Sequence, residues 1–136
     1  SDHGGLDLKQ VIIKYFEEKG IEYKDYGCCD KNSCDYPVFG KAVAEAVAKK
    51  ECEKGIVVCT TGIGISMTAN KVPGVRCALC QDTFSAKMTR LHNDANVLSL
   101  GGAIVGPLLA LDIVETFLNT PFSEEEKHCR RISMME

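Results

Sequence analysis

The sequence has no long apolar run and no excess of positive charge, and both absences narrow its possible functions. None of its apolar runs approaches the roughly 20 residues of a membrane-spanning helix, so we expect no membrane partner. Its 16 Lys and Arg residues are outnumbered by 19 Asp and Glu residues, which gives a net charge of −3. We therefore do not expect nucleic acid to be the main partner.

The sequence also lacks internal repeats, low-complexity segments and linkers. Its 136 residues are 45% hydrophobic and 26% charged, which is ordinary for a globular protein. A chain of this length can bury about two-thirds of its unfolded surface in one core. These properties predict a single domain over residues 1–136.

Cysteine is plentiful, with eight residues in the chain. A secreted disulfide scaffold would be shorter and rich in loops, so we expect reduced thiols and a cytoplasmic location. Cys77 and Cys80 have the spacing of zinc ligands, but residues three apart on a strand point to opposite faces. Cys28, Cys29 and Cys34 fall in a predicted loop, where a metal site remains an alternative.

Helical and strand patterns alternate along the chain, which predicts a parallel sheet with helices on both faces, an α/β fold. The expected strands cover residues 21–26, 55–59, 75–80 and 96–100. The expected helices cover about residues 6–19, 37–47, 64–71, 83–91, 106–118 and 127–132. Ser123 and Glu126 have the spacing of a capping box for the last helix.

The first five residues, Ser-Asp-His-Gly-Gly, have the composition of a loop between a strand and a helix. No strand precedes them in this sequence. We therefore expect that a first strand of about five or six residues, a typical strand length, is missing here.

Cys59 ends an apolar run and is followed by a loop of small residues that reaches Ser66. In an open parallel sheet, ligands bind beyond the carboxyl ends of the strands, and Asp2 and His3 are expected at the same edge. A cysteine at the end of a strand is usually a small buried apolar residue. Backbone N–H groups in the loop, however, could stabilise an oxyanion by about 3 kcal/mol each, and a helix start favours a thiolate. The pattern indicates proton or acyl chemistry on an anionic intermediate.

The same loop has some features of a dinucleotide-binding fingerprint. It contains Gly62 and Gly64, and Asp82 lies twenty residues beyond Gly62. The third small position of the fingerprint, however, is Met67, and too little chain follows for a full dinucleotide domain. These mismatches argue against a nucleotide.

Two further features have both a structural and a functional interpretation. His92 precedes a polar segment, Asn93 to Asn96, which would also suit an ordinary helix-to-strand turn. The cationic segment from Lys127 to Arg131 could stabilise the end of a helix or bind a phosphate, for which arginine offers bidentate geometry.

Together these motifs resemble the ribose-5-phosphate isomerase type B family, which includes galactose-6-phosphate and allose-6-phosphate isomerases. The resemblance covers essentially the whole chain. It rests on residues 1–5, Asp35-Tyr36-Pro37, residues 59–66, Ala69-Asn70-Lys71, Gly74-Val75-Arg76, residues 92–97 and residues 127–131.

The resemblance implies a three-layer α/β/α Rossmann-like fold with five parallel strands and a homodimer or tetramer whose active sites lie at the subunit interface. It implies reversible aldose–ketose isomerisation of a phosphosugar, with no metal and no organic cofactor. By position, Cys59 would be the base that moves a proton between C1 and C2, Thr61 would assist, and His92 would open the sugar ring. The implied substrate-binding residues are Asp2, His3, Tyr36, Thr60, Gly62, Ile63, Gly64, Ser66, Asn93, Lys127 and Arg131.

The sequence departs from the family pattern at the missing strand and at two cationic positions. The usual arginine after the fourth strand is Ala103, and the first arginine of the terminal motif is Lys127. Ribose 5-phosphate is the expected substrate. A hexose 6-phosphate such as allose or galactose 6-phosphate is the alternative, and a weakly catalytic phosphosugar-binding subunit is another.

Overall fold

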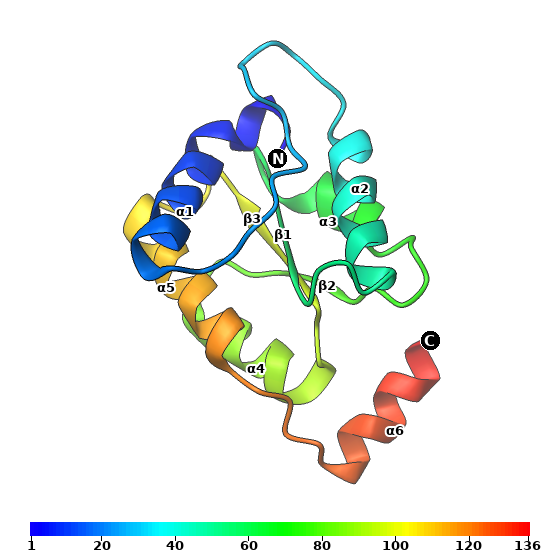
Figure 1. Ribbon diagram of the computed structural model, residues 1–136. Helices are drawn as coiled ribbons and strands as arrows, with labels where there is room; N and C mark the ends of the chain where they lie inside the picture. The colour runs from blue at the N-terminus through cyan, green and yellow to red at the C-terminus, as the bar shows by residue number, and fades with distance from the viewer.

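A computed structural model describes all 136 residues, in which helices and strands alternate around a small parallel sheet (Figure 1). The strands are β1 (Gly55–Cys59), β2 (Cys77–Leu79) and β3 (Val97–Gly101). The helices are α1 (Leu6–Lys19), α2 (Tyr36–Ala48), α3 (Ile63–Ala69), α4 (Thr83–Asn93), α5 (Pro107–Asn119) and α6 (Glu126–Met135), with a short 3-10 turn at His3–Gly5. None of these helices is both long enough and apolar enough to cross a membrane.

The sheet has the order β1-β3-β2, and both pairs of strands are parallel. Gly55 pairs with Val97 and Cys59 with Gly101, so β1 and β3 begin and end together. All five residues of β3 are buried, as expected for a central strand covered on both faces.

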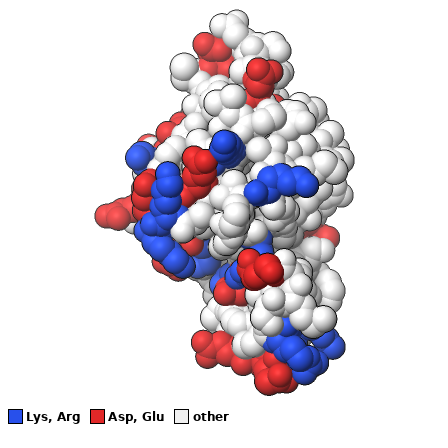
Figure 2. Space-filling view, turned by 90° about the vertical axis from the view of Figure 1, so that its right-hand side faces the viewer, with Lys and Arg blue, Asp and Glu red and all other residues white.

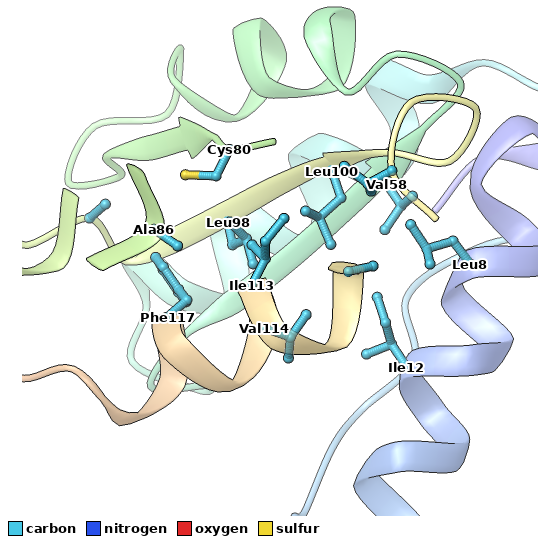
Figure 3. Packing of buried hydrophobic residues seen from close by; sticks show 13 residues of the cluster. Leu8, Ile12, Val58, Cys80, Ala86, Leu98, Leu100, Ile113, Val114 and Phe117 are labelled. Atoms are coloured by element: carbon cyan, nitrogen blue, oxygen red, sulfur yellow. The ribbon is translucent and has the colours of Figure 1, made fainter. Parts of the chain in front are cut away.

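Alternate residues of the strands enter two separate cores. Val58, Leu98 and Leu100 face α1, α4 and α5, where Phe117 is fully buried (Figure 3). Val57, Cys59 and Val97 face α2 and α3 on the other side of the sheet. This two-residue alternation produces the three layers, and the predicted three-layer α/β/α fold is confirmed.

The predicted strand at residues 21–26 is wrong, since this segment forms no ladder with the sheet. A groove of about 650 Å³ separates it from β1 and is lined by Ile12, Val43, Ile56 and Val58 among others. Without a neighbouring strand, the segment cannot form the paired hydrogen bonds of a sheet. The sheet therefore has three strands, where four were expected from the sequence and five from the family.

Ser1 and Asp2 lie at one end of this groove, between β1 and the segment that follows α1. The Asp2 N–H donates to the Val58 carbonyl at 3.2 Å, and the Cys28 N–H donates to the Ser1 carbonyl at 2.9 Å. These bonds connect Ser1 and Asp2 to both sides of the groove, and the expected first strand stays a prediction.

The ends of the helices confirm some of the capping residues predicted from the sequence and contradict others. Gly20 ends α1 with a left-handed φ of 67°, and Pro37 lies in the first turn of α2, as predicted. The capping box is wrong: α6 has Glu125 as its N-cap, and the Ser123 hydroxyl donates instead to the Leu91 carbonyl at 2.7 Å. Helix α6 projects from the lower end of the molecule and reaches the rest of the chain next to α4 (Figure 1).

Candidate functional site

The loop after β1 holds a buried thiol against a backbone amide. Cys59 is only 5% exposed, and the Gly62 N–H donates to its sulfur at 3.1 Å. Gly62 has a φ of 78°, and a Cβ at this position would lie 2.6 Å from Leu79 Cδ1. Only glycine combines this backbone conformation with so little space. The sequence therefore folds this loop so that one amide points at the thiol.

The carbonyl of Gly62 is fixed from the core. The Ser99 hydroxyl, buried in the middle of β3, donates to it at 2.7 Å. Sequence analysis missed this residue, although a serine inside the apolar run Val97 to Leu100 was a usable signal. Ser99 thus holds the Gly62–Ile63 peptide, which directly follows the peptide whose N–H contacts Cys59.

Some amides of the loop are free and others are occupied. The Ile63 N–H donates to the Thr61 hydroxyl at 3.2 Å, and Gly62 is occupied by the Cys59 sulfur. The N–H groups of Thr61 and Gly64 have no hydrogen-bond partner in the chain. These two amides are available to an anionic ligand next to the thiol.

Asp2 and Tyr36 lie against this loop. The Asp2 side chain is buried, and its Oδ1 accepts the Gly5 N–H at 3.1 Å. The Tyr36 ring packs against Gly64 so closely that a Cβ on the glycine would lie 2.6 Å from Tyr36 Cζ. Tyr36 thus contacts the thiol loop, and Asp2 is bound through its N–H to Val58, the residue before Cys59.

His3 is oriented by a residue far away in the sequence. The Cys34 N–H donates to Nδ1 of His3 at 3.2 Å. Because Nδ1 accepts, it carries no proton, and Nε2 carries the ring N–H. Nε2 can therefore donate to a ligand, a role that suits the predicted phosphate contact.

The loop after β3 closes the other side of the thiol loop. The Gly102 N–H donates to the Cys59 carbonyl at 2.8 Å, and the Ala103 N–H donates to the Thr60 carbonyl at 3.0 Å. The Ala103 side chain is exposed at the position of the family's arginine. We call the group at this edge the thiol cluster: Asp2, His3, Tyr36, Cys59, Thr60, Thr61, Gly62, Ile63, Gly64 and Ser66.

His92 and Asn93 lie elsewhere. They end α4 and precede the amino end of β3, whereas Cys59 lies level with Gly101 at its carboxyl end. Four residue steps along β3 cover about 13 Å. One chain therefore does not bring the predicted base and the predicted ring-opening residue together.

Helix α6 meets α4 at His92. The rings of His92 and His128 stack with 4.3 Å between their centroids and 19° between their planes. Burial lowers the pKa of His128, and the neighbouring His92 lowers it further. Sequence analysis did not assign His128, because its neighbour in space is 36 positions away.

The cations of α6 lie around this stacked pair. Lys127 pairs with Glu125 at 3.3 Å and Arg130 with Glu126 at 3.1 Å, so basic and acidic side chains adjoin at the lower end of the molecule (Figure 2). Arg131 has no ion-pair partner in the chain. We call His92, Asn93, Lys127 and Arg131 the histidine cluster.

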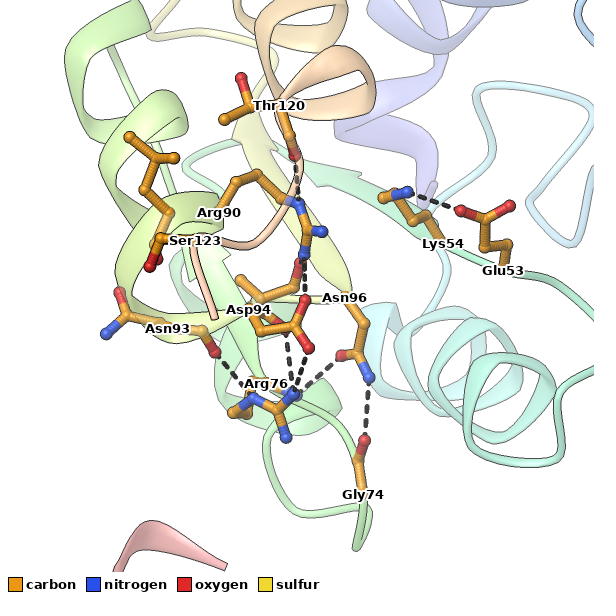
Figure 4. Close-up of polar contacts among 12 residues, drawn as sticks. Glu53, Lys54, Gly74, Arg76, Arg90, Asn93, Asp94, Asn96, Thr120 and Ser123 are labelled. Carbon is orange, nitrogen blue, oxygen red and sulfur yellow. Dashed lines mark hydrogen bonds and ion pairs between the residues drawn. The ribbon is translucent and has the colours of Figure 1, made fainter. Parts of the chain in front are cut away.

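Two arginines hold the corner between α4 and β3 (Figure 4). The buried Arg90 donates to Asp94 at 2.9 Å and to the Thr120 carbonyl at 3.1 Å. Arg76 donates to the Asn93 carbonyl at 2.8 Å and pairs with Asp94 and with Glu136 of α6. These bonds position the histidine cluster.

The chain contains no group of three or more His, Cys, Asp or Glu side chains arranged to hold a metal ion. The loop with Cys28, Cys29 and Cys34 is included in that statement. The polar groups of the two clusters are suited to hydroxyls, an oxyanion and a phosphate.

Known proteins share this sequence and fold. The ribose/galactose isomerase family model matches residues 1–135. A putative sugar phosphate isomerase of Bacillus subtilis is 50% identical over 90% of this chain and 83% of its own, and ribose-5-phosphate isomerase B of Escherichia coli is 41% identical over 96% and 87%. The structure of Clostridium thermocellum ribose-5-phosphate isomerase B superposes with a TM-score of 0.96 and 49% identity, covering 98% of this chain and 90% of that one. The chain therefore belongs to the ribose/galactose isomerase family.

Proposed function

We propose that this protein interconverts ribose 5-phosphate and ribulose 5-phosphate through an enediolate. The observation that carries the proposal is the buried Cys59 thiol, which accepts an amide N–H beside two amides without partners. A base and oxyanion donors in one loop suit the removal of a proton next to a carbonyl. The names of the related enzymes support ribose 5-phosphate as the substrate.

In the proposed reaction, the Cys59 thiolate removes the proton from C2 of the open-chain aldose. The electron pair moves into a C1–C2 double bond and leaves negative charge on the former carbonyl oxygen. The amides of Thr61 and Gly64 stabilise this oxyanion, at about 3 kcal/mol per donor in comparable sites. The Thr61 hydroxyl assists transfer of a proton between O1 and O2, and Cys59 returns its proton to C1.

The Gly62 N–H is the hydrogen-bond donor to Cys59, the proposed base. It donates to the sulfur of Cys59 at 3.1 Å and so orients that sulfur. Asp2 and Tyr36 would hold hydroxyls of the sugar, while His3 would donate from Nε2 to the phosphate. Ser66, whose hydroxyl donates to the Ile63 carbonyl at 2.7 Å, supports the same turn.

The remaining residues require a second copy of the chain. A general acid or base must lie within about 3 Å of the proton that it transfers, so His92 cannot serve the thiol cluster of its own chain. We propose a homodimer in which His92, Asn93, Lys127 and Arg131 of one copy complete the thiol cluster of the other. Ile63 and Met67 are 47% and 62% exposed beside the thiol loop and offer apolar surface for that contact.

Mixing two inactive variants tests both the activity and this arrangement. Cys59→Ala and His92→Ala should each lose ketose formation from ribose 5-phosphate. When equal amounts exchange subunits, half of the dimers are mixed, and each mixed dimer has one intact site. Activity should therefore return to about a quarter of the wild-type value. If activity does not return although subunit exchange is verified, the site is not shared between two copies. If the wild-type protein itself forms no ketose, the proposed isomerase activity is wrong.

A hexose 6-phosphate is the second candidate substrate, and Ala103 favours it. The exposed methyl group beside Thr60 replaces a longer cation, which leaves space and removes one phosphate contact. Comparing kcat/KM for allose 6-phosphate and for galactose 6-phosphate with kcat/KM for ribose 5-phosphate separates the substrates. If the smaller residue sets the preference, Ala103→Arg should shift kcat/KM toward ribose 5-phosphate.

A further inference from the structure

One residue of α6 has no role in the reaction as proposed so far, although it lies against a residue that does. His128 is the only buried residue of α6, with 6% of its surface exposed. Its ring stacks on the ring of His92, with 4.3 Å between the centroids and 19° between the planes. His92 itself is exposed. The pair therefore consists of one ring that a ligand can reach and one ring that supports it from within the chain.

The stack is the contact that orients the His92 ring. Of the three histidine rings, only that of His3 has a hydrogen-bond partner in the chain. His92 lies in the last turn of α4, and an exposed side chain without a partner changes its rotamer within nanoseconds. The flat face of His128 covers one side of the ring and so restricts this rotation.

Other bonds hold α6 next to α4, so the stack is not needed for attachment alone. The hydroxyl of Ser123, three residues before α6, donates to the Leu91 carbonyl at 2.7 Å. At the other end of α6, Glu136 pairs with Arg76, whose Nε donates to the Asn93 carbonyl at 2.8 Å. The two residues that flank the stacked histidine of α4 are therefore linked to both ends of α6.

We propose that His128 is a positioning residue for His92: its buried ring holds the imidazole of His92 in the orientation that opens the sugar ring in the site of the partner copy. The inference rests on the proposed function, in which His92 transfers the protons of ring opening. Displacing a reacting group by about 1 Å can cost about 100-fold in rate, so an orienting contact has a large effect. His128 does not touch the sugar, because its ring is buried in its own chain.

The chemistry of ring opening explains why an uncharged ring suits this position. The hydroxyl at C1 of the cyclic sugar loses its proton, the bond between C1 and the ring oxygen breaks, and that oxygen gains a proton. An aldehyde and a hydroxyl result, with no net gain or loss of protons. His92 accepts one proton and returns one, so it passes through its cationic form. Burial lowers the pKa of His128, and the neighbouring His92 lowers it further, so at neutral pH its ring is uncharged beside that cation.

The test compares two apolar replacements of His128. His128→Phe keeps a flat ring for the stack, whereas His128→Leu fills the buried position without one. With ribose 5-phosphate, kcat should fall by about tenfold or more in His128→Leu and by less than about threefold in His128→Phe, with a smaller change in KM. Cys129→Ala removes an exposed side chain from the same helix and should keep the wild-type kcat.

A second measurement separates ring opening from proton transfer at the thiol. Ribulose 5-phosphate has no ring form, because the phosphate occupies the hydroxyl that would close the ring. Exchange of a C1 proton of this ketose for deuterium in D2O therefore needs only the thiol cluster. Proton NMR should show exchange at a similar rate in His128→Leu and in the wild type, although ketose formation from ribose 5-phosphate is reduced in the variant.

Three results would overturn the inference. A wild-type kcat in His128→Leu would show that the stack is not needed. Equal losses in His128→Leu and His128→Phe would assign the effect to the ring nitrogens of His128 rather than to the stack. Deuterium exchange that falls as much as ketose formation would mean that the variant disturbs the site as a whole. If the wild type forms no ketose, the proposed function itself fails, whereas an active wild type with an unaffected His128→Leu variant contradicts only the role of His128.

Discussion

The thiol cluster and the histidine cluster are built in opposite ways. The thiol loop is held by buried groups on several sides, including the Ser99 hydroxyl below it and Gly102 beside it. The histidine cluster is exposed, and its helix α6 is attached by one ring stack and an ion pair from Arg76 to Glu136. A base and its oxyanion donors gain from a fixed geometry, because the electrostatic environment is then set before the reaction. Groups that must reach another copy of the chain are better placed on a projecting element.

The largest expected effect is on the thiol itself. Cys59→Ser should reduce kcat for ribose 5-phosphate isomerisation by about 10²- to 10⁴-fold, because removing a general base costs that much. The measurement is the rate of ketose formation. Cys77→Ala is the matched control, because burial raises the pKa of this other sheet thiol to about 12, so it is protonated at neutral pH and cannot act as the base. A serine variant with wild-type activity would show that Cys59 is not the base.

The second test separates backbone strain from lack of space. Gly62→Ala should reduce the free energy of unfolding by about 3 kcal/mol, since its φ is 78° and its new methyl group would meet Leu79 and the Leu100 backbone. Gly74→Ala has a similar φ of 86° but open space around it, so about 1 kcal/mol is expected. Denaturant unfolding measures both values, and equal losses would mean that packing around Gly62 is looser than described.

Next to the histidine cluster, a buried arginine should matter more to stability than an exposed one. Arg90→Leu leaves the carbonyls of Ala95 and Thr120 without their donor and should reduce the free energy of unfolding by about 2–3 kcal/mol. Arg130→Ala removes only an exposed pair with Glu126 and should cost less than about 1 kcal/mol. Chemical denaturation checks the difference, and a reversed order would contradict the role of Arg90 at this corner.

The smallest expected effect is a pH dependence of the attachment of α6. The pKa of His128 is lowered by burial, then by His92, and Lys127 and Arg131 also lower it while Glu125 raises it. The neutral His128 ring therefore contributes its full stabilisation to folded α6 above about pH 6.5, the pKa of histidine in the unfolded chain. This contribution is lost as the pH falls below that value. Hydrogen exchange in α6, corrected for intrinsic rates, should accelerate between pH 7.5 and 5.5. His128→Phe keeps a ring for the stack and should remove this dependence.

Local patterns predicted the parts of the fold that depend on neighbours in sequence. The spacing of Leu8 and Ile12 predicted α1, and the apolar run ending at Cys59 predicted β1, because each signal reflects burial of one short element. Residues 21–26 have a strand-like composition but no strand beside them. Composition alone does not predict whether a segment has a neighbouring strand with which to pair. The capping box failed because α6 begins at Glu126 with Glu125 as its N-cap, so Ser123 lies before the cap and its hydroxyl donates to the Leu91 carbonyl of α4.

The candidate site shows the same division. The thiol and its glycine loop are consecutive residues, so their proximity was evident from the sequence. The contacts of His3 with Cys34 and of His92 with His128 join positions 31 and 36 residues apart and depend on how the helices pack. The register of β3 placed Cys59 and His92 at opposite edges, which a linear order of motifs does not reveal.

Ser99 links mutational tolerance in the core to the fidelity of the reaction. Replacing its hydroxyl by hydrogen, as in Ser99→Ala, removes one heavy atom from a fully buried position and changes its volume little. The Gly62 carbonyl would nevertheless keep only its longer bond, from the Ser66 N–H at 3.3 Å, which would loosen the turn next to the amide that contacts the thiol. In a scan that measures abundance and turnover separately, Ser99→Ala should therefore lose more turnover than abundance. Selection at this interior position would act on chemistry as much as on folding.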